Sequence, residues 1–183
     1  MIIYIHGFGS SGFSGKATFF KEHFESEIIL PSLSYVPALA IHTLEQLIEM
    51  LLKSGENVNL VGSSLGGYYA IYLACKYDLR AVLINPAIIP YKTLDKIGMS
   101  TNYFDMSTFE VTLEHLNALR VLEVKKVQNQ ENFMVLLQKG DEVLNYKEAV
   151  EKLPNANLYI EEGGNHSFED ITRYFSAIDK FFN

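Results

Sequence analysis

Residues 58–67 read VNLVGSSLGG, and this stretch decides the fold. A short apolar run, 58–61, leads into Gly-x-Ser-x-Gly with Ser64 at its centre, and a helical run over 65–77 follows. On a sharp turn between strand and helix, a serine hydroxyl is lifted clear of the sheet, and the flanking glycines let the two elements approach closely. The pattern therefore predicts that Ser64 is a nucleophile.

The register of the motif separates Ser64 from its neighbour Ser63. A nucleophile at Ser63 would need glycines at the two positions where Val61 and Leu65 stand. The helix that follows would direct its free N–H groups and the positive end of its dipole toward the anion formed in acyl transfer. The alternative interpretation is a turn of small residues that only permits close packing.

A serine nucleophile needs a base, and the sequence offers five histidines. His166 lies in Gly-Gly-Asn-His between the last predicted strand and the final helix, at the carboxyl end of a strand, where α/β sheets place their ligands. His6, at the end of the first predicted strand, is a competitor. The remaining three fall inside helical patterns: His23, His42 and His115.

The orienting acid should come from a third strand end. Asp141 follows the apolar run 133–137 through Gly140, and Glu142 is the fallback. Three other aspartates lie between Ser64 and this strand without a position at a strand end: Asp78, Asp95 and Asp105. An aspartate after glycine is often a turn residue, but the chain order serine, aspartate, histidine is that of α/β-hydrolases.

The oxyanion formed during acyl transfer needs two N–H donors. One is expected from Leu65, directly after the nucleophile, and the other from the loop after the first strand. That loop reads HGFG over residues 6–9, so the N–H of Phe8 is the expected second donor. Its glycines could also serve only a tight turn.

Short apolar runs alternate with helical patterns along the whole chain. The expected strands are residues 2–5, 28–30, 58–61, 81–84, 133–137 and 158–160. Several are continuous rather than alternating, as is typical of strands covered on both faces. Two apolar helix faces are formed by Ile41, Leu44, Ile48 and Leu51, and by Phe168, Ile171, Phe175, Ile178 and Phe182. The alternation predicts one α/β domain, residues 1–183, with about six mostly parallel strands and helices on both faces.

Two capping-box spacings predict helix starts. Ser167 with Asp170 would open the last helix, and Ser107 with Glu110 would open an earlier one. Residues 86–107 show no hydrophobic period and are longer than an ordinary connection between a strand and a helix, which favours a functional loop. Its larger side chains either line a substrate mouth or pack as a local cluster: Tyr91, Tyr103, Phe104 and Met106.

The composition excludes several classes of partner. The chain has 183 residues, of which 48% are hydrophobic, and its net charge of -7 would be repelled by a nucleic-acid backbone. No apolar stretch approaches the length of a membrane span, and the start, MIIYIHG, is typical of a strand and not of a signal peptide. We expect a cytoplasmic protein that binds neither membrane nor nucleic acid.

The single cysteine, Cys75, excludes an intrachain disulfide and is expected in the core.

These segments together resemble the small YqiA-like bacterial esterases of the α/β-hydrolase superfamily. The matching segments are residues 6–8 with Ser10, Ser11 and Lys16, then 61–70 (VGSSLGGYYA), 85–87, 140–146 (GDEVLNY) and 163–168 (GGNHSF). The resemblance implies a three-layer α/β-hydrolase fold without a large cap domain, with Ser64, Asp141 and His166 as catalytic triad. It implies hydrolysis of carboxylic esters without a cofactor, and we expect no metal. Residues 99–127 depart most from this family.

The function expected from the residues and the resemblance is hydrolysis of a small or short-acyl ester through an acyl-enzyme. Two alternatives remain: an acyl-CoA thioesterase, and a hydrolase-like protein that binds a ligand without turning it over. A small-molecule ester or thioester is the expected partner. The oligomeric state is left open.

Overall fold

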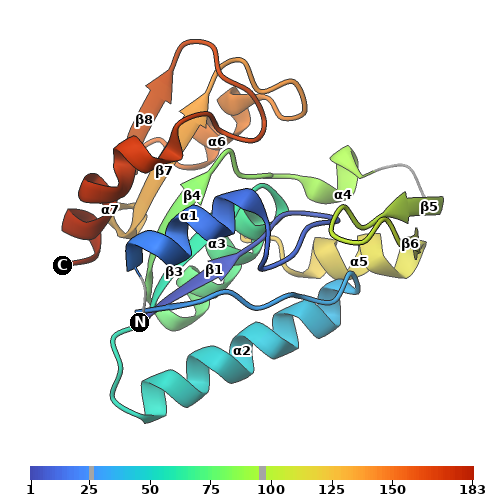
Figure 1. Ribbon diagram of the computed structural model, residues 1–183, viewed down its shortest axis with the longest axis horizontal. Helices are drawn as coiled ribbons and strands as arrows, with labels where there is room; N and C mark the ends of the chain where they lie inside the picture. Colours follow the sequence, from blue (N-terminus) through green and yellow to red (C-terminus); the bar gives the residue numbers. More distant parts are fainter. Residues whose placement is uncertain (25–26, 95–97) are drawn as a thin grey trace.

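The computed structural model describes residues 1–24, 27–94 and 98–183, and its centre is a six-stranded sheet (Figure 1). The strands lie in the order β2-β1-β3-β4-β7-β8 and every neighbouring pair is parallel. Their bounds are β1 Ile2–Ile5, β2 Ile28–Ile29, β3 Asn59–Ser63, β4 Arg80–Ile84, β7 Phe133–Gln138 and β8 Asn157–Glu161. The predicted mostly parallel sheet of about six strands is confirmed.

Helices cover both faces of the sheet, because the strand side chains alternate between two cores. In β1, Ile2 and Tyr4 pack toward α1 (Gly15–Phe24) and α7 (Phe175–Phe182). Ile3 and Ile5 belong to the opposite core, which is covered by α2 Pro37–Lys53, α3 Leu65–Tyr77, α5 Leu113–Val121 and α6 Tyr146–Lys152. In Figure 1, α1 and α7 lie in front of the sheet and α3 lies behind it. Each leucine or isoleucine buried in these cores contributes about 1.5–3 kcal/mol.

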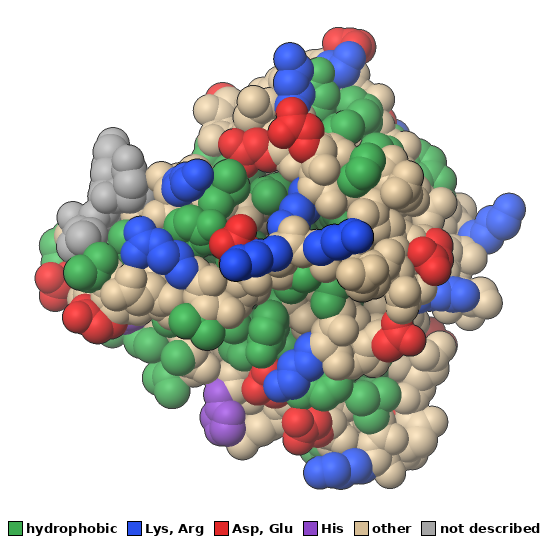
Figure 2. All heavy atoms as spheres, turned by 180° about the vertical axis from the view of Figure 1, so that it is seen from behind, with side chains coloured by type: hydrophobic (Ala, Val, Ile, Leu, Met, Phe, Trp, Pro, Cys, Tyr) green, Lys and Arg blue, Asp and Glu red, His purple; other side chains and the backbone are tan. Residues whose placement is uncertain are grey.

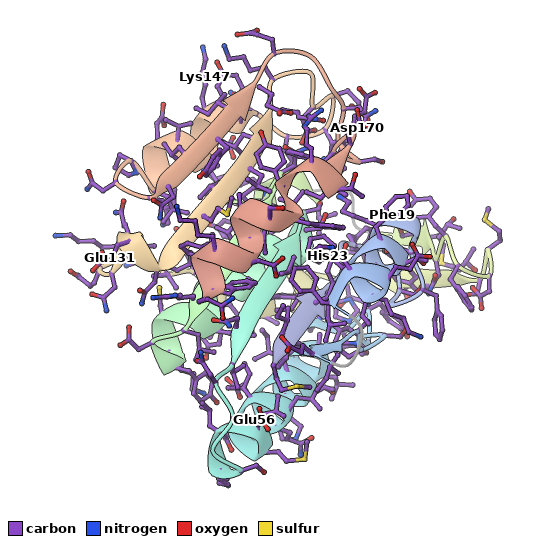
Figure 3. All side chains as sticks on the ribbon, turned by 60° about the vertical axis from the view of Figure 1, so that its left-hand side comes forward. Phe19, His23, Glu56, Glu131, Lys147 and Asp170 are labelled. Carbon is purple, nitrogen blue, oxygen red and sulfur yellow. The ribbon has the colours of Figure 1, made fainter. Side chains whose placement is uncertain are left out.

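The two helices on the front face also contact each other directly. The imidazole Nε2 of His23 on α1 lies 2.9 Å from a carboxylate oxygen of Asp179 on α7. The same ring packs against Phe175, with centroids 4.6 Å apart. Figure 3 shows His23 in the space between these helices. The contacts of His23 with Asp179 and Phe175 give this histidine a structural role between the two helices.

A small β-hairpin stands apart from the central sheet, and it corrects the expectation of an irregular loop over 86–107. After β4 come α4 (Pro90–Thr93) and the antiparallel strands β5 (Gly98–Thr101) and β6 (Thr108–Val111). At the tip of the hairpin, the N–H of Tyr103 donates to the carbonyl of Gly9 at 2.7 Å. This bond holds the hairpin against the loop that follows β1.

The capping box expected at Ser107 and Glu110 is wrong. Residues 108–111 form β6, where buried and exposed side chains alternate with the period of a strand. The helix begins later, at Leu113, where Thr112 and His115 form the actual capping box: each backbone N–H donates to the other side chain at 3.3 Å. Pairing with β5 therefore decided the conformation of this segment.

The capping box expected at Ser167 and Asp170 is also wrong. Asp170 has φ 52° and makes no side-chain cap, a short 3₁₀ turn η3 (Ile171–Tyr174) follows, and α7 begins only at Phe175. The expected apolar face is nevertheless correct, because all five of its members are buried: Phe168, Ile171, Phe175, Ile178 and Phe182. A second 3₁₀ turn, η2 (Gln130–Asn132), precedes β7.

The surface holds one further correction. Cys75 is exposed on α3, although the apolar run around it predicted a core position. Figure 2 shows both acidic and basic side chains on the face seen from behind, with several basic ones in a row across its middle. Among the helices described, none combines the length and the hydropathy of a membrane span.

Candidate active site

The turn between β3 and α3 holds Ser64 in an unusual conformation. Its backbone has φ 54° and ψ -120°, a region that non-glycine residues adopt only under strain, often at functional sites. The flanking glycines make the turn possible. A Cβ on Gly62 would lie 2.4 Å from the Gly66 carbonyl oxygen, and one on Gly66 would lie 2.0 Å from the carbonyl oxygen of Ile5. The strand-turn-helix context predicted for the motif is present.

Three strand ends bring Ser64, His166 and Asp141 into one chain of hydrogen bonds. His166 Nε2 lies 3.0 Å from Ser64 Oγ, and His166 Nδ1 lies 2.8 Å from an oxygen of Asp141. Since an ionised carboxylate only accepts hydrogen bonds, Nδ1 carries the ring proton and Nε2 accepts from the serine hydroxyl. The side chain of Asp141 is 3% exposed and that of His166 is 23% exposed, so the histidine borders the open site.

The carboxyl group of Asp141 is kept ionised by its hydrogen bonds. Burial alone would raise its pKa, but the bonds from His166 and from the N–H groups of Leu144 and Val143 outweigh burial, and the net pKa is lowered. Both N–H groups donate at 2.8 Å. This backbone cradle holds the carboxylate in the orientation that the imidazole needs.

The loop that carries His166 is anchored by residues whose role the sequence did not predict. Glu142, the fallback acid, accepts from the backbone N–H of His166 at 3.0 Å and is not bonded to the ring. Buried Asn85, at the end of β4, donates to the carbonyls of Asn165 at 3.0 Å and His166 at 3.3 Å. Gln138, at the end of β7, accepts from the N–H groups of Asn165 and Glu169. For Asn85 and Gln138, the signal available in the sequence was a polar residue directly after an apolar run.

The two expected oxyanion donors lie beside Ser64. Leu65 is the first residue of α3, and Phe8 lines the same cavity as Ser64. In the described part of the chain, no acceptor is bonded to either N–H group. Gly7 brings the loop close to Ser64: a Cβ there would lie 3.1 Å from Ser64 Cβ and 3.6 Å from Ser64 Oγ.

The structure assigns the competing histidine a structural position. His6 is buried, its Nδ1 donates to the carbonyl of Gly7 at 2.8 Å, and its Nε2 accepts from the N–H of Leu33 at 2.9 Å. Burial lowers the pKa of His6, and the bond to Gly7 offsets this only in part. The neutral ring therefore links the loop after β1 to the segment after β2.

The aspartates weighed against Asp141 take other positions or lie outside the described residues. Asp78 caps the end of α3 and accepts from the side chain of Asn129 at 2.8 Å. Asp105 accepts from the N–H of Ser107 in the hairpin turn. Asp95 lies outside the residues that the structure describes. Within those residues, no group of three or more His, Cys, Asp or Glu side chains is arranged to hold a metal ion.

The site opens into a cavity of about 680 Å³ between α1 and the segment that follows β8. Phe19 of α1 and Asp170 before η3 face it from either side (Figure 3). Tyr103 of the hairpin also lines it. Of the other aromatic residues that were expected either to line a mouth or to pack as a local cluster, Tyr91 donates to Glu123 at 2.9 Å and Phe104 packs on Phe13, with centroids 5.7 Å apart.

The cavity lining includes Lys16, which belongs to the segments that resemble the family and for which the sequence predicted no role. Lys16, in the first turn of α1, donates from Nζ to Ser63 Oγ at 2.8 Å. This bond engages Ser63, so the two serines of the elbow, the turn between β3 and α3 over residues 62–66, have separate partners: Ser63 binds Lys16 and Ser64 binds His166.

Comparisons with known proteins identify the family and the fold of this chain. A family model described as "Uncharacterised protein family (UPF0227)" matches residues 1–183. UPF0227 protein YcfP of Escherichia coli K12 is 28% identical over 187 residues, covering 99% of this chain and 98% of YcfP.

The solved structures show that the fold is that of the α/β-hydrolases, as predicted. Alpha/beta hydrolase domain-containing protein 10 from mouse matches with a TM-score of 0.73 at 18% identity, covering 98% of this chain and 88% of the mouse chain. Est1E from Butyrivibrio proteoclasticus, solved with ferulic acid bound, matches with a TM-score of 0.71 at 15% identity, covering 98% and 86%. No large cap domain is present in the described residues.

Proposed function

The chain belongs to the UPF0227 family, whose description names no reaction, and we propose from its own geometry that it is a serine hydrolase of carboxylic esters. One observation carries this proposal: Ser64 Oγ, the His166 ring and Asp141 form a continuous hydrogen-bonded chain at the mouth of a cavity. A protein that only binds a ligand has no need of an oriented acid–base pair next to a strained serine.

In the proposed mechanism His166 Nε2 takes the proton of Ser64 while Oγ attacks the carbonyl carbon of the ester. The negative charge moves to the carbonyl oxygen, which accepts hydrogen bonds from the N–H groups of Phe8 and Leu65. As the ester C–O bond breaks, the imidazolium gives its proton to the leaving alkoxide oxygen. Water then attacks the acyl-serine by the same route and releases the acid. Asp141 stabilises the imidazolium and keeps the ring proton on Nδ1.

The substrate proposed is a small or short-acyl ester. Beyond the central sheet and the helices that cover it, the described chain adds a two-stranded hairpin, which leaves little chain to enclose a long acyl group. Turnover of acyl-CoA thioesters is the alternative, since the same acyl-enzyme chemistry cleaves both bonds. We infer no metal or cofactor requirement for this mechanism.

A fluorophosphonate probe tests the proposal directly, because it labels only a serine that is activated as a nucleophile. We expect one labelled peptide, the one that contains residue 64, and no label on Ser64→Ala. Ser63→Ala is the matched control, since it removes the neighbouring hydroxyl and should leave labelling in place. Labelling of Ser63, or of no residue, would contradict the proposal.

A further inference from the structure

Lys16 places an ammonium group in the wall of the active-site cavity, directly beside the elbow. Its Nζ binds Ser63, the residue before Ser64, and all three line the cavity together with His166. The lysine side chain is partly buried, whereas lysines are mostly exposed in folded proteins. The ammonium therefore borders the space that an ester attached at Ser64 would occupy.

Lys16 forms no ion pair with any of the residues that the structure describes. Ser63 accepts from one of its three N–H donors, and in the described parts of the chain no carboxylate forms a salt bridge with it. The charge of Asp141 favours its protonated form, but the oxygens of Asp141 already accept from His166 and two backbone N–H groups. Burial lowers the pKa of Lys16 to about 8, so the side chain is mostly protonated at neutral pH.

The acidic side chains near the cavity are exposed and have partners of their own. Glu169 accepts from the side-chain amide of Asn165 at 2.8 Å. Asp170 pairs with Arg173 at 3.6 Å. The rest of the polar lining consists largely of hydroxyl groups, which can donate to an anion: Ser10, Ser14, Ser167 and Thr172. A partly buried cation without an ion-pair partner is costly for a folded protein, and an anion bound in the cavity would offset that cost.

We propose that Lys16 recognises an anionic group, a carboxylate or a phosphate, carried by the ester substrate. This inference rests on the proposed function and narrows its substrate class. Lys16 then acts in specificity, by favouring charged esters over neutral esters of the same shape. The structural alternative is that Lys16 only ties α1 to β3 through Ser63.

Three acetate esters with the same reacting bond separate these possibilities: 4-acetoxybenzoate, 4-acetoxyphenyl phosphate and the neutral 4-acetoxybenzamide. We expect kcat/KM to favour at least one of the two anions over the amide by about tenfold or more. Lys16→Met should reduce that ratio to near one. The matched control is Lys21→Met, which removes an exposed charge from the same helix and should keep the ratio.

The outcome for each substrate decides whether Lys16 recognises an anion or only links α1 to β3 through Ser63. An equal loss on all three esters in Lys16→Met, or no preference in the wild type, would overturn the inference. Comparing the two anions shows whether carboxylate or phosphate is the group recognised. Lys16→Gln, which keeps a polar contact with Ser63, replaces Lys16→Met if the thermal midpoint shows that the latter is not folded.

A binding measurement keeps this inference separate from the proposed esterase activity. Calorimetry on Ser64→Ala and on Ser64→Ala with Lys16→Met measures affinity for 4-acetoxybenzoate and 4-acetoxyphenyl phosphate without turnover. If binding depends on Lys16 while the wild type hydrolyses no ester, the anion subsite stands and the proposed function fails. If esters are hydrolysed and Lys16→Met leaves the affinity unchanged, only the proposed anion subsite is contradicted.

Discussion

Glu142 accepts a hydrogen bond from the backbone N–H of His166 at 3.0 Å, whereas the imidazole of His166 is bound by Asp141. Two adjacent carboxylates thus hold one histidine in different ways. Asp141 orients the ring and Glu142 holds the main chain. Their separate contacts allow the two residues to be distinguished by substitution.

Asp141→Asn should lower kcat for a p-nitrophenyl ester by at least about a hundredfold. The amide can donate to Nδ1 of His166, which favours the tautomer with its proton on Nε2, facing Ser64. In the trypsin-type triad, the equivalent change costs about four orders of magnitude in kcat. The measurement is steady-state hydrolysis, with affinity for a non-reacting ester analogue measured in parallel and expected to change little.

Glu142→Gln is the control for this prediction. Its side-chain oxygen can still accept from the His166 N–H, so kcat should remain close to the wild-type value. The opposite pattern, a crippled Glu142→Gln beside a nearly normal Asp141→Asn, would make Glu142 the orienting acid.

Gly7→Ala should lower kcat/KM by about ten- to hundredfold with little change in the free energy of unfolding. The new Cβ would lie 3.1 Å from Ser64 Cβ, so the serine or the loop must shift by a few tenths of an ångström. Gly62→Ala is the contrasting variant, because its Cβ would meet the Gly66 carbonyl at 2.4 Å. We expect that change to destabilise the fold by about 1–3 kcal/mol or more. Denaturant unfolding of both variants, beside their kinetics, checks the pair.

The rate constant kcat/KM should be highest for short acyl chains and decline as the chain lengthens. The cavity of about 680 Å³ is open between α1 and the segment after β8, and no described element closes over it as a lid. A series of p-nitrophenyl esters from acetyl to palmitoyl measures the dependence. Turnover that rose steadily to palmitoyl would favour the thioesterase alternative.

The stability difference between wild type and Lys16→Met should depend on pH above about pH 8. The pKa of Lys16 is about 8 in the folded protein and about 10.4 in an unfolded chain, so between these values the unfolded state binds more protons. The free energy of unfolding of the wild type should therefore rise relative to Lys16→Met from pH 8 to 10.5. Below pH 8 the burial cost is fully present. Urea unfolding of both proteins at pH 7 and pH 10 measures the change, with Lys21→Met as reference.

The elements predicted well were those whose signal is local. Each strand of the central sheet is an apolar run, and Ser64, Asp141 and His166 were found because each follows such a run. Their shared place at the carboxyl edge follows from parallel strands, so their proximity was predictable. Their catalytic roles remain predictions.

The features that sequence reasoning missed depend on contacts distant in the chain. Ser107 and Glu110 have the spacing of a helix start, but pairing with β5 makes residues 108–111 a strand. The sequence predicted no contact for Lys16, because its partner Ser63 is 47 positions away. Cys75 sits in an apolar run whose exposed side becomes visible only once α3 is packed on the sheet.

The hairpin of β5 and β6 has a consequence for how this protein can diverge. It pairs with itself outside the central sheet, yet it contributes Tyr103 to the cavity. The side chains at its tip, Tyr103, Phe104 and Met106, are 72%, 63% and 69% exposed, so most replacements there cost little stability. Replacements at the rim can therefore change the lining of the cavity without altering the turn that carries Ser64 or the loop that carries His166. A library randomised over residues 103–106 is the natural starting point for directed evolution of new specificities.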